Sequence, residues 1–238
     1  MYTLAEFSII DKRSNYSLPI EIKKKIQQLC KQIGAEPSFT ILSQDKKTVQ
    51  DCIREINKLT NDNKNIQIPI ILEILETIQV EDFVGPFFNM VHKNLFSSKV
   101  YAELFRQFKH ELFHTVFLEQ YDKYISSFDT IQIIDSSNYD DFCEMNLVHD
   151  KRRTFTHFIV NLGKKEYYDQ VVKKVLSKID DYLDVDKDIM NELVEILFIL
   201  NPSDIESKNK IKTLSTLNPS EHNGINYKII FRFMDILK

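Results

Sequence analysis

The sequence predicts an all-α fold built from antiparallel helical hairpins. Between Val49 and Phe108, apolar residues recur at intervals of three and four along four successive segments. Each segment is apolar on one side only, and such a helix is stable only when that side packs against a neighbour. The connections are short, which favours antiparallel pairing. The chain has only four glycines and six prolines, which argues against a turn-rich all-β fold.

The N-terminal part of the chain should contain an arm and one helix before this region. Residues 1–18 form a leader of mixed polarity. A helix is expected from Pro19, since proline suits the first helical position, to Gly34, since glycine is common at helix ends. The region 19–238 is then expected to form a single helical domain.

The four segments should extend the helical region to about Phe128, and Gly85-Pro86 should bend or interrupt the third of them. Residues 129–150 are polar and aperiodic, which predicts a long internal loop with at most a short helical turn at 139–148. Four further helices are predicted from their apolar periodicity. They cover residues 152–162, 172–183, 189–200 and 227–237, with a break at Asn201-Pro202-Ser203.

Two stretches are more specific than the periodicity. The first segment ends in Asn57-Lys58-Leu59-Thr60, and the fourth contains Ser97, Tyr101-Ala102 and Arg106 at matching distances. This order resembles the middle domain of eukaryotic translation initiation factor four-G, the scaffold of the cap-binding complex. The stretches 152–162 and 227–237 resemble two later helices of that family.

The resemblance implies a right-handed, HEAT-like solenoid of about ten helices. It also implies a cytoplasmic protein of translation initiation that binds a DEAD-box RNA helicase, touches both of its lobes and speeds its ATP cycle. Such a scaffold performs no chemistry of its own and needs no cofactor. Related helical domains serve mRNA decay and splicing, so an adaptor in one of those pathways is an alternative.

The candidate contact residues come partly from this resemblance and partly from charge. Those expected to contact a protein partner are Asn57, Lys58, Thr60, Arg152, Arg153, Phe158, Arg232 and Asp235. Arg152 and Arg153 are favoured because of their charge and expected exposure, whereas Phe158 and Phe231 match positions of the family but are expected in the core. Those that could contact mRNA are Lys164, Lys165, Lys173 and Lys174. A cap-binding protein could attach through the N-terminal arm, although Tyr2 and Phe7 fit the expected motif poorly because Ser8 fills its hydrophobic position.

One motif points to a different class of protein. His110-Glu111-Leu112-Phe113-His114 fits the H-E-x-x-H pattern, in which two histidines on a helix bind zinc and the glutamate acts as general base. The sequence lacks the longer continuation of that motif, and only Glu144 and His149 could supply a third ligand nearby. A zinc metalloprotease is therefore a weak alternative, and no metal site is predicted.

Bulk properties limit the remaining classes. The formal net charge of −4 does not match a dedicated nucleic-acid binder. Three widely spaced cysteines without a C-x-x-C pair indicate reduced thiols in a reducing compartment. No apolar run is long enough to span a membrane, and the N-terminus does not resemble a secretory signal. The sequence thus favours a cytosolic or nuclear protein.

Overall fold

The computed structural model describes residues 20–32, 47–131 and 139–238, and every regular element within these ranges is helical. The chain divides into two units, residues 1–46 and 47–238. This division differs from the expected boundary at residue 18, because helix α2 (Ile20–Gln32) belongs to the first unit. The predicted arm at 1–18, including Tyr2 and Phe7, lies outside the described residues.

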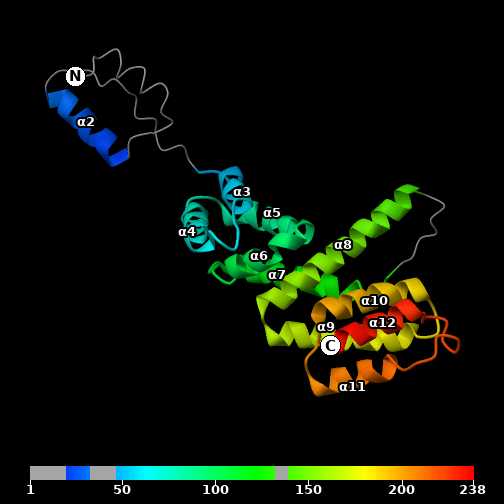
Figure 1. Cartoon of the computed structure of the whole chain (residues 1–238). Coiled ribbons are helices and arrows are strands. Elements are labelled where there is room, and N and C mark those ends of the chain that lie inside the picture. Colours follow the sequence, from blue (N-terminus) through cyan, green and yellow to red (C-terminus); the bar gives the residue numbers. More distant parts are fainter. Residues whose placement is uncertain (1–19, 33–46, 132–138) are drawn as a thin grey trace, which may run out of the picture. The chain divides into compact units, whose positions relative to one another are not determined.

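The second unit contains the remaining helices (Figure 1). They are α3 (Val49–Asn57), α4 (Lys64–Leu75), α5 (Val80–Lys93), the short 3-10 helix η1 (Leu95–Ser97), α6 (Ser98–Phe105), α7 (Glu111–Ser126), α8 (Tyr139–Leu162), α9 (Lys165–Tyr182), α10 (Lys187–Leu200), α11 (Ile205–Leu214) and α12 (Tyr227–Ile236).

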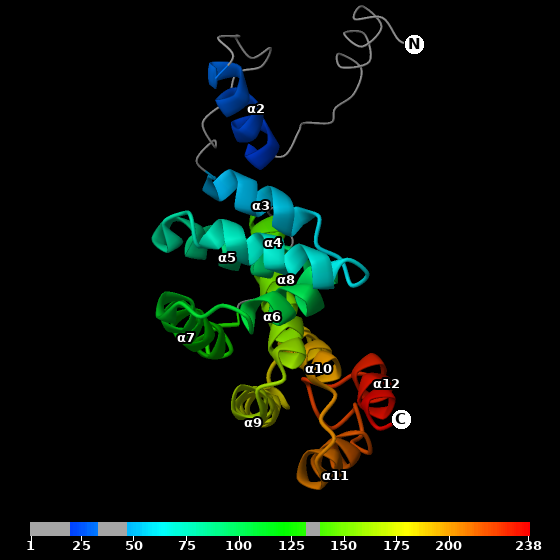
Figure 2. The same cartoon turned by 90° about the vertical axis from the view of Figure 1, so that its left-hand side faces the viewer.

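Helix α8 connects the two halves of this unit. It packs against α5 and α6, which precede it in the chain, and against α9 and α10, which follow it (Figure 2). Neighbouring helices also pair, as in α3 with α4, α9 with α10 and α11 with α12. Because α8 contacts helices that are distant in sequence, the unit is more than a row of sequential hairpins.

Aromatic rings fill the core between α8 and the helices that precede it in the chain. Phe83, Phe87 and Phe117 are almost completely buried, as are Phe155 and Phe158 on α8. The Phe105 ring lies 5.3 Å from that of Phe117 and 5.7 Å from that of Phe158, so side chains of three helices meet there. The apolar periodicity predicted the faces that carry Phe87 and Phe105, whereas Phe83 and Phe117 were not among the residues that it marked.

Hydrogen bonds at the helix ends explain several boundaries. Thr48 and Asp51 form a reciprocal capping box at the start of α3. Asp186 accepts hydrogen bonds from the backbone N–H groups of Asp188 and Ile189 at the start of α10. At the end of α10, Asn201 adopts a left-handed backbone with φ of 46°, which stops the helix where the break was predicted.

The predicted loop at 129–150 is wrong over its second half, because α8 begins at Tyr139 and runs without interruption to Leu162. Tyr139, Leu147 and Val148 are exposed, so this part of the helix follows no buried stripe and has no apolar period to detect. Asp140 and Asp141 occupy its first turn, where negative charge favours a helix.

Three other boundaries differ from the expectations. The fourth predicted segment is split, since α6 ends at Phe105 and α7 begins at Glu111. Helix α11 was not predicted, because its buried side chains are few and mostly separated by charged residues. Helix α5 continues through Pro86 without interruption. Within the described ranges, no helix is long and apolar enough to cross a membrane.

Candidate functional site

A groove runs between α10 and α12. It comprises two adjoining cavities of about 550 and 530 Å³. Both cavities are lined by Glu195 of α10 and by Arg232 and Asp235 of α12. Arg232 and Asp235 were both predicted from the sequence to contact a partner. The structure brings these two residues together in one concave surface.

Arg232 is held in place from two sides. Its Cζ lies 3.5 Å from the centre of the Phe198 ring, and its Nη2 lies 2.6 Å from a carboxylate oxygen of Glu195. Its Nε is buried and has no hydrogen-bond partner among the described residues. The guanidinium thus presents a flat, ordered face to the groove and retains an unused donor.

Phe231 and Phe198 line the groove, and further exposed apolar side chains share a face of α12 with Phe231. Tyr227, Phe231 and Met234 are 68%, 60% and 43% exposed, and their spacing of four and three residues places them on one face of α12. Phe198 on α10 is 38% exposed. Aromatic, methionine and arginine side chains are enriched in the centres of protein interfaces, so this surface has the composition of a protein-binding site.

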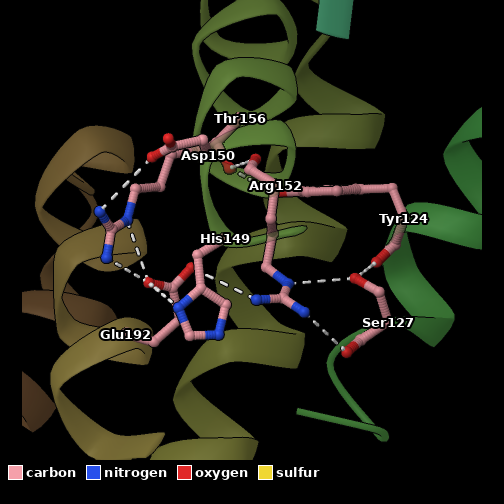
Figure 3. A network of polar contacts seen from close by, with 8 residues as sticks. Tyr124, Ser127, His149, Asp150, Arg152, Thr156 and Glu192 are labelled. Carbon is pink, nitrogen blue, oxygen red and sulfur yellow. Dashed lines mark hydrogen bonds and ion pairs between the residues drawn. The ribbon is translucent and has the colours of Figure 1, made fainter. Parts of the chain in front are cut away.

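The interior beside α10 contains a buried charge network (Figure 3). Glu192 is only 2% exposed, and its carboxylate faces two arginines of α8. Arg152 Nη1 lies 3.3 Å from Glu192 Oε1, and Arg153 Nε donates to Glu192 Oε2 at 3.0 Å. Because the two guanidinium groups bind different oxygens, the carboxylate is satisfied on both sides.

Arg152 extends this network to the end of α7. Its Nε donates to the Ser127 hydroxyl at 3.2 Å, and its Nη2 lies 3.4 Å from the Ser127 carbonyl oxygen. Beside it, the hydroxyl groups of Tyr124 and Thr156 lie 2.7 Å apart. The arginine side chain is only 5% exposed, so its role is to join α7, α8 and α10 rather than to contact a partner.

Three partly buried histidines should make the folding stability depend on pH. Burial lowers the pKa of His149, the charges of Arg152 and Arg153 add to this, and Glu192 opposes it. Burial also lowers the pKa values of His92 and His157. The folded protein therefore binds fewer protons than the unfolded chain at mildly acidic pH.

We expect the thermal midpoint to be highest above pH about 6.5, the ordinary histidine value, and to fall as the pH drops below it. Thermal unfolding followed by circular dichroism between neutral pH and pH about 5 measures this. His149→Gln should reduce the slope. A midpoint that stays constant over this range would contradict the assignment of neutral, buried imidazoles.

Several predicted contact residues lie elsewhere. Phe158 is completely buried, so its prediction as a partner contact is wrong, and Arg152 is only 5% exposed, with its guanidinium bound by Glu192 and Ser127. Arg153 has a half-buried side chain directed to Glu192. The expectation that Phe231 lies in the core is wrong, since this side chain is 60% exposed and lines the groove.

Asn57, Lys58 and Thr60 are exposed at the end of α3, but two of them belong to local capping interactions. Lys58 forms an ion pair with Glu55 at 2.7 Å. The Thr60 backbone N–H donates to the side chain of Asn63, whose amide group in turn donates to the Lys58 carbonyl. These contacts stop α3 and fix the turn into α4.

The four lysines proposed for RNA contact lie on α9 or immediately before it. Lys164, Lys165 and Lys173 are exposed, whereas Lys174 forms an ion pair with Asp129 at 2.7 Å. The Lys174 charge is thus locally neutralised, and the sequence-derived set does not form a uniform basic surface.

The H-E-x-x-H motif does not have the expected helical geometry. His110 is the N-cap of α7, with an extended backbone, and its Nδ1 accepts a hydrogen bond from the Leu112 N–H. His149 faces Glu192, and Glu144 is exposed. Across the described ranges, no cluster of three histidine, cysteine or acidic side chains is arranged to hold a metal ion. Cys52 is buried, which raises the pKa of its thiol to about 12.

The groove lining includes Phe198 and Phe231, neither of which the sequence prediction named as a contact, and Tyr227 and Met234 share a face of α12 with Phe231. A signal existed in α12, since its buried residues already occupy one face and these further apolar residues extend the apolar surface beyond it. Comparison of this chain with protein-family models, with curated proteins and with solved structures yields no match.

Proposed function

We propose that this chain is a helical scaffold of translation initiation that binds a DEAD-box RNA helicase and stimulates its ATP cycle. The carrying observation is the groove between α10 and α12. It combines exposed aromatic side chains with the ordered Arg232 guanidinium, which is the composition of a protein-binding hot spot. The choice of partner rests on the resemblance of the sequence to the middle domain of initiation factor four-G.

The residues that carry the resemblance have structural roles. Leu59, Tyr101 and Ala102 are buried. Arg106 donates through Nη1 to the carbonyl oxygens of Asn161 and Leu162 and so caps the C-terminus of α8. A likeness in residues that fix helix ends and helix packing supports a common architecture, which we propose to be a right-handed HEAT-like solenoid.

A scaffold of this kind acts by binding and not by chemistry. A DEAD-box helicase has two lobes joined by a flexible linker, and a rigid surface that binds both lobes favours one arrangement of them. If that arrangement lies between the open and closed states, each ATP cycle requires less movement and proceeds faster. Contact with mRNA through the lysines of α9 would be a secondary role.

Replacing Phe231 by aspartate should weaken helicase binding by about tenfold or more, because it removes an exposed aromatic anchor and introduces charge beside Asp235. A pull-down with a purified initiation-type DEAD-box helicase measures binding, and the ATPase rate with and without the chain measures stimulation. Phe231 is 60% exposed, so the substitution should leave the fold intact.

Tyr139→Asp is the matched control, since Tyr139 is 76% exposed and lies at the start of α8, where an added negative charge is tolerated. This variant should bind and stimulate the helicase normally. Failure of the unmodified chain to bind or stimulate any initiation-type helicase would refute the proposed function. Equal binding by the two variants would refute the role of the groove.

A further inference from the structure

A second cleft, separate from the groove, lies where α5, α7 and α8 meet. Its volume is about 460 Å³. Helix α5 contributes Asn89, His92 and Lys93, helix α7 contributes Gln120, Lys123 and Tyr124, and helix α8 contributes Val148, Lys151, Arg152 and Phe155, with Ser127 directly after α7. The C-terminal turns of two helices and the middle of a third thus form one concave surface.

The cleft is strongly basic. Three exposed lysines, Lys93, Lys123 and Lys151, converge on it from three different helices. Within the ranges that the structure describes, none of the three forms an ion pair with a carboxylate, so their charges are not neutralised by the protein. The described residues that line the cleft include no aspartate or glutamate.

Ordinary helix electrostatics explain only part of this arrangement. Lys93 and Lys123 lie in the last turns of α5 and α7, where a positive charge is favoured by the helix dipole. Lys151 lies in the middle of α8, where the dipole offers no such benefit. Three unneutralised ammonium groups around one concavity repel one another unless an anion joins them.

The inner wall of the cleft is ordered. The His92 ring stacks on that of Phe155 at a centroid distance of 4.8 Å, and its Nε2 lies 3.3 Å from the side-chain oxygen of Gln120. His92 Nδ1 is buried and has no hydrogen-bond partner among the described residues. Arg152 is fixed by Ser127 and Glu192. The site therefore provides mobile ammonium groups around a rigid wall.

We propose that this cleft binds a compact anion carrying several phosphate groups, such as a nucleoside triphosphate or an inositol polyphosphate. A small ligand with clustered phosphates can contact all three lysines at once, and ammonium–phosphate hydrogen bonds are among the stronger polar contacts. The volume suits a ligand of this size. This proposal does not depend on the helicase.

The observations favour a compact ligand over an RNA strand. A strand spreads its charges along a track, and its affinity grows with the number of lysines on that track. The lysines predicted to contact RNA lie on α9, do not line this cleft, and include Lys174, which Asp129 neutralises. The lysines of the cleft are therefore not continued by the α9 lysines into one track.

Isothermal titration calorimetry of the full chain with sodium triphosphate at constant ionic strength tests the proposal, with sodium sulfate as the reference anion. Triphosphate should bind at least about tenfold more tightly than sulfate. ATP and inositol hexakisphosphate are titrated in parallel. Tighter binding of ATP identifies a nucleotide as the ligand class, and tighter binding of inositol hexakisphosphate identifies an inositol polyphosphate.

The double variant Lys123→Glu/Lys151→Glu should weaken triphosphate binding by about tenfold or more, since two phosphate contacts become repulsive. Lys165→Glu/Lys173→Glu changes the net charge equally, involves exposed residues outside the cleft, and should bind triphosphate normally. Circular dichroism verifies that both variants are folded.

Two outcomes would overturn the proposal. In the first, triphosphate, ATP and inositol hexakisphosphate bind no more tightly than sulfate, or they bind equally well to the two double variants. The other is single-stranded RNA binding that is lost in Lys123→Glu/Lys151→Glu while the three compact anions bind no better than sulfate, which would assign the cleft to RNA.

Discussion

Replacing Glu192 by alanine is expected to lower the free energy of unfolding by about 3–5 kcal/mol. The carboxylate is 2% exposed and interacts with Arg152, whose guanidinium is equally shielded from water. Without Glu192, Arg152 remains as a buried positive charge whose hydrogen-bond acceptors among the described residues are the hydroxyl and carbonyl oxygens of Ser127. The loss is large because an unpaired buried charge costs far more than an exposed one.

Urea unfolding followed by circular dichroism measures this effect, and Glu195→Ala is the matched control. Glu195 lies on the same helix and also pairs with an arginine, but both side chains of that pair are 30% exposed, so its removal should cost at most about 1 kcal/mol. Glu192→Leu combined with Arg152→Met should recover much of the lost stability, because no charge is left buried. A loss below about 1 kcal/mol for Glu192→Ala would show that Arg152 finds water or another partner.

The sequence predicted most of the helices because burial imposes a regular apolar period. Helices α3, α9 and α10 each bury one face. The predicted range of α10 agrees closely with the observed one, whereas α9 begins seven residues before its predicted start. Where no face is buried, that signal disappears. The first half of α8 is mostly exposed and was missed as a helix, and α11 was missed because its buried face is short and contains only two apolar side chains, Ile211 and Leu214.

The functional surfaces were harder to predict because exposure depends on tertiary packing. The adjacent arginines Arg152 and Arg153 have equal charge, yet one is buried and the other only partly. Glu192 stands among the apolar residues of α10, and a carboxylate on a buried stripe was the available signal that it pairs with an arginine of another helix. The basic cleft assembles lysines separated by up to about 60 residues, so no local motif could indicate it.

Replacing Phe87 by alanine is the second substitution expected to cost about 3–5 kcal/mol. This side chain is completely buried in α5, and it joins α5 to the segment between α6 and α7. Its ring lies within 6.3 Å of the rings of Phe83, Phe88, Tyr101, Phe105, Phe108 and Phe113. Truncation removes these contacts and leaves a cavity that surrounding helices can fill only partly.

Phe96 offers a contrast within the same part of the chain, since it is 96% exposed in η1. Phe96→Ala should change the free energy of unfolding by no more than about 0.5 kcal/mol in the same urea titration. The difference between the two variants therefore measures burial at constant chemistry. An equal loss of unfolding free energy in Phe87→Ala and Phe96→Ala would contradict the aromatic core between α8 and the helices that precede it. The basic cleft formed by α5, α7 and α8 would then lack its rigid wall.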